Sequence, residues 1–380
     1  MAGQGADGRF VTAERLFDDG ANRYDALLVV SFGGPEGPED VMPFLDNVLE
    51  GLRLPEAAKR AVARRYERFG GVSPINAHTR ALVAALEDAL ARAGLALPVY
   101  CGNRNWHPLL PDTLRKMETD GIERAAAFVT STFGSYNGCR KYREDLHAAA
   151  RGLERPPQID KLRYGYNHPG FIAAFTERVR DALAKIPAKR RDDAPILFTA
   201  HSLPEAAARR APYVEQLREA CALVAAGLGR PGSRRRLVFQ SRNARYGPDD
   251  WLGPDVRDAL AEEKSNGATD VVLAPIGFVC DHLEVVLDLD VEAKERADEL
   301  GIGMVRAATV GTHPEFVGMV LDLVRERMTA DPVRAALGSR GPSHDLCPSD
   351  CCPSGRPGPG KPAIGGHPLP PAWPDPPPDR

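Results

Sequence analysis

The stretch VVLAPIGFVCDHLEVVLDLDVEAKE, residues 271–295, joins a strand pattern to a helix pattern. Its first eight residues form an almost continuous apolar run, which indicates a strand buried on both faces. At helical pitch, five of the following acidic residues share one stripe: Asp281, Glu284, Asp288, Glu292 and Glu295. A buried strand followed by a helix is the repeating unit of an α/β fold.

The same alternation recurs along most of the chain. Further apolar runs predict strands at 26–32, 98–103, 125–132, 196–201, 236–241 and 304–310. Helical patterns lie between them, including 78–94, 168–186 and 213–229. These units predict two doubly wound parallel-sheet domains, 24–186 and 187–337, which meet near the polar segment PAKRRDDAP.

The C-terminal segment, residues 338–380, has a different composition. It is dominated by proline and glycine, which predicts a disordered or polyproline-like tail. Only its cysteines suggest a function.

Composition and charge exclude several classes of protein. The net charge of −3 argues against a nucleic-acid-binding surface. The apolar runs are far shorter than the roughly 20 residues of a spanning helix, so we expect no transmembrane segment. The first residues lack the pattern of a secretory signal. We therefore expect a cytoplasmic protein with reduced thiols, and we expect a monomer.

Candidate site residues follow the predicted strands, where ligands bind in this fold class. His201 ends one strand pattern, and the acidic stripe begins just after another. Imidazole and carboxylate groups together suit a divalent first-row metal such as Fe²⁺, held loosely for transit. Two alternatives stay open: the stripe is a solvated helix face, and His201 is a core or capping histidine.

Four cysteines form a second candidate site. The tail segment CPSDCCP supplies Cys347, Cys351 and Cys352, and Cys139 in the loop SYNGC is the best fourth ligand. Four thiolates suit zinc or an iron–sulfur cluster. The alternative is an incidental group of reduced thiols.

Taken together, the strand-end motifs resemble those of one family. They are SFGGPEGPEDVMPFLDNV, FGGVSPIN, GNRNWHP, STFGSYNGC, TAHSLP and PIGFVCDHLEVVLDLD. In this order, over about residues 24–330, they resemble the ferrochelatases, most closely the Gram-positive-type coproporphyrin III ferrochelatases. The resemblance implies two similar Rossmann-like domains with an inter-domain cleft for the porphyrin. It also implies insertion of Fe²⁺ into coproporphyrin III to give coprohaem during haem biosynthesis.

The resemblance also implies residue roles. His201 and Glu284 match the family's metal- and proton-handling pair, and Asp288 and Glu292 extend that pair into an entry path for iron. The porphyrin-contacting positions match Ser73, Tyr136, Arg65 and Tyr66. Some members hold a [2Fe–2S] cluster on four cysteines, which match Cys139, Cys347, Cys351 and Cys352. Phe32 replaces the tyrosine that ligates iron in some members.

Three alternatives to this activity remain open. The porphyrin could be protoporphyrin IX, or the metal could be cobalt or nickel in another tetrapyrrole. A non-catalytic porphyrin or haem carrier would keep the same fold. Haem-pathway enzymes are the expected protein partners.

Overall fold

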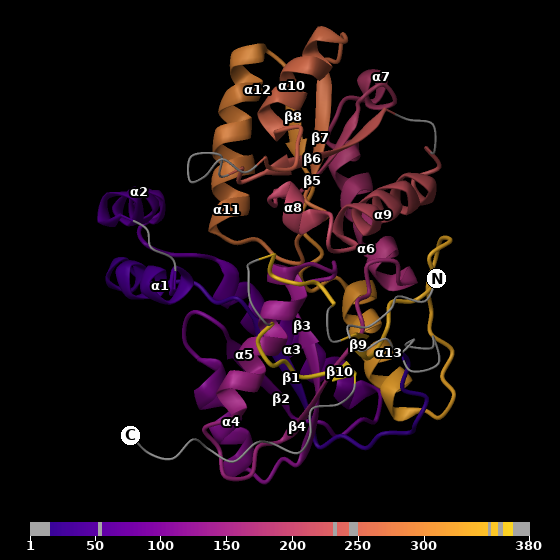
Figure 1. The fold of residues 1–380 in the computed structure, drawn as a ribbon. Coiled ribbons are helices and arrows are strands. Elements are labelled where there is room, and N and C mark those ends of the chain that lie inside the picture. The colour runs from indigo at the N-terminus through magenta and orange to yellow at the C-terminus, as the bar shows by residue number, and fades with distance from the viewer. Residues whose placement is uncertain are drawn as a thin grey trace.

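The computed structural model describes residues 16–51, 55–230, 234–242, 250–348, 351–355 and 360–367. Within these residues, two four-stranded parallel sheets lie in two units, one above the other in Figure 1. We call the unit that carries β1–β4 the first unit and the one that carries β5–β8 the second unit. The prediction of two similar α/β domains is confirmed.

The two sheets share one strand order. The first runs β2-β1-β3-β4, with β1 Ala26–Ser31, β2 Val99–Asn103, β3 Arg124–Val129 and β4 Gln158–Lys161. The second runs β6-β5-β7-β8, with β5 Ile196–His201, β6 Arg235–Gln240, β7 Asp270–Ala274 and β8 Gly303–Arg306. In each sheet the first strand in the chain is central. All residues of β1 and β7 are buried, which explains their continuous apolar sequences.

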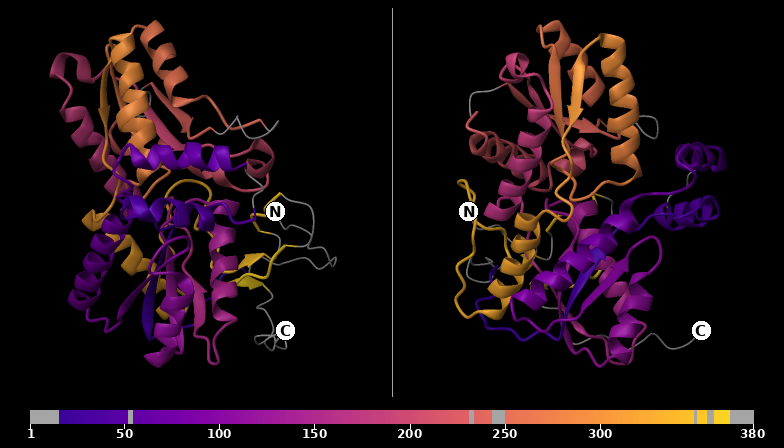
Figure 2. Two further views of the ribbon diagram at one scale, coloured as in Figure 1. Left: turned by 90° about the vertical axis from the view of Figure 1, so that its left-hand side faces the viewer. Right: turned by 180° about the vertical axis from the view of Figure 1, so that it is seen from behind.

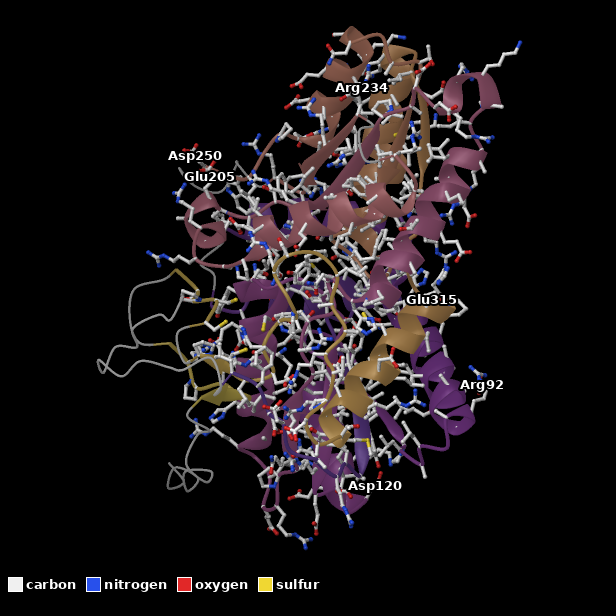
Figure 3. All side chains as sticks on the ribbon, turned by 90° about the vertical axis from the view of Figure 1, so that its right-hand side faces the viewer. Arg92, Asp120, Glu205, Arg234, Asp250 and Glu315 are labelled. Atoms are coloured by element: carbon white, nitrogen blue, oxygen red, sulfur yellow. The ribbon has the colours of Figure 1, made fainter. Side chains whose placement is uncertain are left out.

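Helices cover the faces of both sheets. In the first unit they are α1 Val41–Val48, α2 Glu56–Glu67, α3 Ile75–Arg92, α4 Leu110–Thr119 and α5 Lys141–Ala150. The later helices are α6 Pro169–Ala184, α7 Ala188–Arg191, α8 Glu205–Ala208, α9 Tyr213–Gly227, α10 Val256–Ser265, α11 Leu283–Val285, α12 Lys294–Leu300 and α13 Pro314–Met328. Two π-helical turns are η3 Tyr136–Arg140 and η5 Val286–Ala293, and η2 Pro38–Asp40 is a 3₁₀ turn. Charged side chains such as Arg92, Asp120 and Arg234 lie on the outside (Figure 3).

One apolar core runs through both units. It includes Phe128 of β3 and Phe198 of β5, and Phe171 and Phe175 of α6 belong to it as well. Helix α13 returns from the second sheet to the first, where Phe316 packs edge-on against Phe128 with 6.0 Å between ring centroids. The predicted division at residues 186 and 187 stays a prediction, and α13 packs beside α3 and α6 of the earlier segment.

Part of the proline- and glycine-rich tail is described and docks on the first unit. Its strands β9 Cys347–Pro348 and β10 Gly366–His367 pair in parallel. The Arg143 guanidinium of α5 donates from Nε to the carbonyl oxygen of Ile364 at 2.6 Å. Asp345 is buried and accepts hydrogen bonds from Arg334 at 2.9 and 3.1 Å. These contacts hold the described part of the tail in place despite its composition.

Among the described residues, no helix combines the length and apolar composition that crossing a membrane requires.

Candidate active site

Two neighbouring strands of the second sheet bring His201 and Glu284 together. His201 is the last residue of β5, and Glu284 lies in α11, after the loop that follows β7. Because β5 and β7 are parallel neighbours, their carboxyl ends lie side by side. His201 Nε2 is 3.5 Å from Glu284 Oε2. The two side chains are 35% and 45% exposed, so a ligand can reach both.

The surrounding backbone fixes the tautomer of His201. Its Nδ1 lies 2.5 Å from the carbonyl oxygen of Ser202, which can only accept a hydrogen bond. Nδ1 therefore carries a proton, and Nε2 faces Glu284. The hydroxyl of Tyr213 donates to the carbonyl oxygen of His201 at 3.0 Å and steadies the strand end. Nε2 is thus the atom that exchanges a proton or meets a metal.

His201 and Glu284 stabilise each other's charged forms. Burial opposes the charge on His201, but the hydrogen bond and the charge of Glu284 outweigh it and raise the pKa of His201 to about 9. Burial likewise opposes ionisation of Glu284, yet the bonded His201 lowers the pKa of Glu284 to about 2. At neutral pH the ligand-free site therefore holds an imidazolium–carboxylate pair.

The acidic row continues along one helix. Asp288 is buried and accepts a short hydrogen bond from the hydroxyl of Ser241. Burial, followed by the charge of Glu284, raises the pKa of Asp288 to about 6. Glu292 lies four residues after Asp288 and pairs with two arginines. Its Oε2 is 3.4 Å from Arg257 Nη1, and its Oε1 is 3.8 Å from Arg65 Nη2. Asp288 and Glu292 lie on η5, which directly follows the turn of α11 that carries Glu284.

The other two members of the predicted stripe lie elsewhere. Asp281 accepts hydrogen bonds from Arg306 at 2.9 Å and Thr309 at 3.1 Å, so it closes a structural ion pair. Glu295 is exposed at the start of α12.

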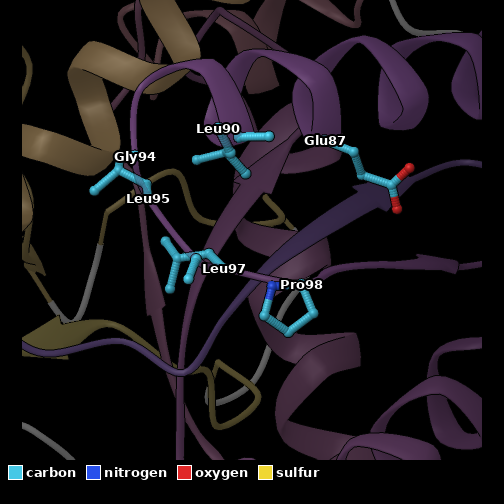
Figure 4. Close-up of a pocket in the computed structure, with 8 residues that line it drawn as sticks. Glu87, Leu90, Gly94, Leu95, Leu97 and Pro98 are labelled. Carbon is cyan, nitrogen blue, oxygen red and sulfur yellow. The ribbon is translucent and has the colours of Figure 1, made fainter.

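A small cavity at the outer end of the row is lined by both units. Arg65 comes from α2 of the first unit, and the second unit contributes Gln240, Ser241, Arg242, Asp255, Val256, Arg257, Asp288 and Glu292. Helices α1 and α2 project from the first unit on the same side as α11 (Figures 1 and 2). Figure 4 shows a different hollow, at the end of α3, and none of its lining residues belongs to this site.

Helix α2 carries Arg65 and Tyr66 toward the acidic row. Burial, followed by the charge of Glu284, raises the pKa of the Tyr66 hydroxyl. The Tyr66 ring packs edge-on against Phe44 with 5.6 Å between centroids. Phe32 also packs edge-on against Phe44, with 6.3 Å between ring centroids.

The remaining porphyrin-contact candidates lie in the first unit. Ser73 is buried, and its backbone N–H donates to the carbonyl oxygen of Pro35 at 2.8 Å. Tyr136 begins η3 and donates its hydroxyl hydrogen bond to Glu144 at 3.0 Å. Ser73 lies between α2 and α3, beside the segment that follows β1, and Tyr136 lies in the first turn after β3. Ligands of such folds bind beyond the carboxyl ends of the strands.

Comparisons with known proteins give the family of the chain. The family model described as Ferrochelatase matches residues 24–328. The chain belongs to the ferrochelatase family. A ferrochelatase of Rhodopirellula baltica is 49% identical over 336 residues, covering 87% of this chain and 93% of that protein. A coproporphyrin III ferrochelatase of Streptomyces griseus is 48% identical over 368 residues, covering 90% and 96%. Among solved structures, SirB from Bacillus subtilis with Fe³⁺ has a TM-score of 0.48 at 14% identity, covering 80% and 96%.

The structure adds site residues of this ferrochelatase that sequence reasoning did not single out. Gln240 ends β6 and Ser241 follows it, both contact Asp288, and Arg257 pairs with Glu292. Their signal is the end of this strand, where Gln240 lies beside His201 of β5 although the two residues are distant in the chain.

The four candidate cysteines lie near one another in this structure. Cys347 Sγ and Cys351 Sγ lie within 4.8 Å of each other, and the thiols of Cys139 and Cys347 shift each other's pKa. Cys351 Sγ is 3.7 Å from Cys352 Sγ. His344, which the sequence did not suggest, places Nε2 3.7 Å from Cys351 Sγ. His344, Cys347 and Cys351 offer ligand atoms that all lie within 4.8 Å of one another.

These donors fit a metal–thiolate group. Cys139, Cys347 and Cys352 are at most 4% exposed, which suits a shielded site. The thiols of Cys139 and Cys351 lower the pKa of Cys347, and Cys351 lowers that of Cys352, whereas the pKa values of Cys139 and Cys351 are raised. Cys347 and Cys352 are therefore the members that favour the thiolate form. Thiolates are the ligands of both zinc and iron–sulfur clusters. We refer to Cys139, Cys347, Cys351 and Cys352 as the sulfur site.

Proposed function

We propose that this ferrochelatase inserts Fe²⁺ into coproporphyrin III to give coprohaem in haem biosynthesis, as a metal chelatase of the lyase class. The names of its relatives and their high coverage support this substrate. The observation that carries the chemistry is the His201–Glu284 pair, which joins a proton acceptor to a metal-binding carboxylate at an accessible site.

Iron insertion must remove the two inner N–H protons of the porphyrin. His201 is protonated in the ligand-free site, so it must lose a proton before it can accept one. An approaching Fe²⁺ competes with the imidazolium for the carboxylate of Glu284 and so lowers the pKa of His201. The imidazolium proton leaves along the acidic row, and the neutral Nε2 then accepts the two pyrrole protons in turn, passing the first to the same row before it takes the second. Proton release is thus coupled to the arrival of the metal.

The acidic row supplies a path to the surface. Asp288 has a pKa near neutrality, so it can change its protonation state during turnover. Glu292 lies at the small cavity beyond it. We propose that hydrated iron enters, and protons leave, along Glu284, Asp288 and Glu292. Carboxylates spaced along one helix hold a divalent ion weakly enough for transit.

The porphyrin lies between the units in this proposal. Arg65 is 48% exposed and can pair with a propionate group. Tyr66, Ser73 and Tyr136 contact the ring. Arg104 is a further candidate for pairing with a propionate group. Its Nε lies 2.6 Å from Asp145 Oδ2, so its charge is already balanced within the protein.

We propose further that the sulfur site holds a [2Fe–2S] cluster on its four cysteines. When bound, the cluster supplies a one-electron redox centre. Cys139 belongs to η3 and Cys347 to the tail, so ligands from both segments hold the tail against η3. The alternative is a zinc site, because four cysteine thiolates also bind zinc. Cytoplasmic location, a monomeric state and haem-pathway partner enzymes stay predictions.

A side-by-side turnover assay tests the substrate. Purified protein is given Fe²⁺ under anaerobic conditions with coproporphyrin III or protoporphyrin IX. We expect a higher kcat/KM for coproporphyrin III. A preference for protoporphyrin IX would change the substrate, and binding without turnover of either porphyrin would favour a carrier.

A further inference from the structure

Two buried cations lie beside the sulfur site without a carboxylate partner. Arg143 of α5 is 1% exposed and Lys161, the last residue of β4, is 2% exposed. Within the described ranges, no ion pair joins either side chain to an acidic residue, whereas Arg140 and Lys141 on the same turn of chain pair with Glu144 and Asp145. A buried charge without a compensating group is strongly unfavourable.

The protein contacts of these two cations are neutral. Arg143 Nε donates to the carbonyl oxygen of Ile364 at 2.6 Å, and its buried Nη1 has no hydrogen-bond partner. Lys161 Nζ donates to the carbonyl oxygen of Leu162 at 2.6 Å and lies 4.3 Å from the centroid of the Tyr164 ring. Neutral partners satisfy some donors but leave both charges unbalanced.

The tail packs its cysteine-bearing strand directly on these cations. The backbone N–H of Cys347 donates to the carbonyl oxygen of Gly365 at 2.9 Å. A Cβ atom at Gly366 would lie 3.1 Å from Arg143 Nη2 and 3.8 Å from the carbonyl oxygen of Cys347. The guanidinium is therefore held against the strand that carries Cys347. A Cβ atom at Gly365 would lie 3.8 Å from Cβ of Lys161 and 3.9 Å from Arg143 Nε, so both cations lie at the segment that pairs with Cys347.

We propose that Arg143 and Lys161 balance the negative charge of the metal–thiolate group in the sulfur site and set its reduction potential. The inference rests on the proposed [2Fe–2S] cluster. Four thiolates, two sulfides and two ferric ions make a dianion, which two buried cations neutralise. Reduction adds another negative charge, so the same cations favour the reduced form. Removing one of them makes the midpoint potential more negative.

Four variants of the full-length protein test this inference. Lys161→Met and Arg143→Met remove one charge each with little loss of volume. Arg143→Lys keeps the charge and changes the hydrogen bonds to the tail. Lys141→Met is the matched control, because that cation lies on the same helix and is already paired with Asp145. Iron and acid-labile sulfide are measured per chain, and the midpoint potential is measured by electron paramagnetic resonance during a dithionite titration.

We expect Lys161→Met and Arg143→Met to lower the midpoint potential or the cluster content, while Arg143→Lys and Lys141→Met stay near wild type. If Arg143→Met fails to assemble a cluster, the result for Lys161→Met is decisive, because Lys161 Nζ donates to Leu162 and no hydrogen bond joins it to the described part of the tail. An unchanged potential and full cluster content in Lys161→Met would overturn the inference. A wild-type protein that contains zinc and no iron–sulfur cluster would instead remove the cluster proposal, and the inference with it.

Discussion

The imidazole of His201 and the carboxylate of Glu284 meet at the ends of two neighbouring strands, with 3.5 Å between Nε2 and Oε2. This contact gives the carboxylate two competing cationic partners, the imidazolium and an incoming metal ion. When Glu284 binds the metal, it no longer stabilises the charged form of His201, so metal binding favours loss of the proton from His201. The predictions below follow from this competition.

Removing either member of the pair should abolish most of the activity. His201→Ala deletes the proton acceptor, and Glu284→Gln deletes the charge that attracts the metal. General acid–base groups contribute about 10²- to 10⁴-fold, so we expect losses in that range. Initial rates of Zn²⁺ and Fe²⁺ insertion measure them. Glu295→Gln is the control, because Glu295 is exposed beyond the acidic row. Rates close to wild type for both His201→Ala and Glu284→Gln would refute the mechanism.

The ionisation of His201 should depend on Glu284. In the ligand-free protein we expect a pKa of about 9, and Glu284→Gln should bring it down to 6.5 or below, because burial then acts without the opposing charge. Nuclear magnetic resonance of the imidazole Cε1–H measures both values. Since folding raises the pKa of His201 and lowers that of Glu284, the pair stabilises the fold fully between about pH 4.5 and 6.5. It loses this contribution as the pH rises through about 9 or falls through about 2. A His201 pKa that the substitution leaves unchanged would contradict the pairing.

Substitution of Asp288 should lower the catalytic efficiency toward Fe²⁺ and leave the KM for the porphyrin unchanged. Asp288→Asn removes one charge from the path while keeping the shape of the side chain. We expect kcat/KM for Fe²⁺ to fall about tenfold, equivalent to about 1.4 kcal/mol, with KM for the porphyrin unchanged. Asp290→Asn is the control, because Asp290 lies on the same helix and pairs with Arg306. A larger effect on the KM of the porphyrin would place Asp288 at the ring instead of on the path.

Much of the fold could be predicted from the sequence, because buried parallel strands have continuous apolar sequences. Strand β4, with the sequence QIDK, was missed because it is a short edge strand and two of its residues are charged. The π-helical turn η5 was also missed. Its hydrophobic pattern resembles that of an α-helix, and the wider turn depends on the packing around Asp288.

The candidate site could be predicted only in part. Strand ends predict which residues face a ligand, but they do not predict which ones pair. Asp281 was grouped with Glu284 by helical pitch, yet it precedes α11 and pairs with Arg306 of β8. His344 gave no signal, because its distance from the tail cysteines in the sequence fits no spacing rule for a metal site. Its place beside Cys351 depends on how the tail docks.

The sulfur site should lose its cofactor when its internal ligand is removed. Cys139 is the member that belongs to the first unit, so Cys139→Ser leaves the three tail cysteines without their anchor. We expect loss of the visible absorption band of the cluster and faster proteolysis of the tail. Cys221→Ser is the control, because Cys221 is a buried core residue of α9 remote from these ligands in the sequence. An absorption band that survives Cys139→Ser would exclude Cys139 as a ligand. Colourless wild-type protein with stoichiometric zinc would identify the site as a zinc site, which the four thiolates and His344 can also build.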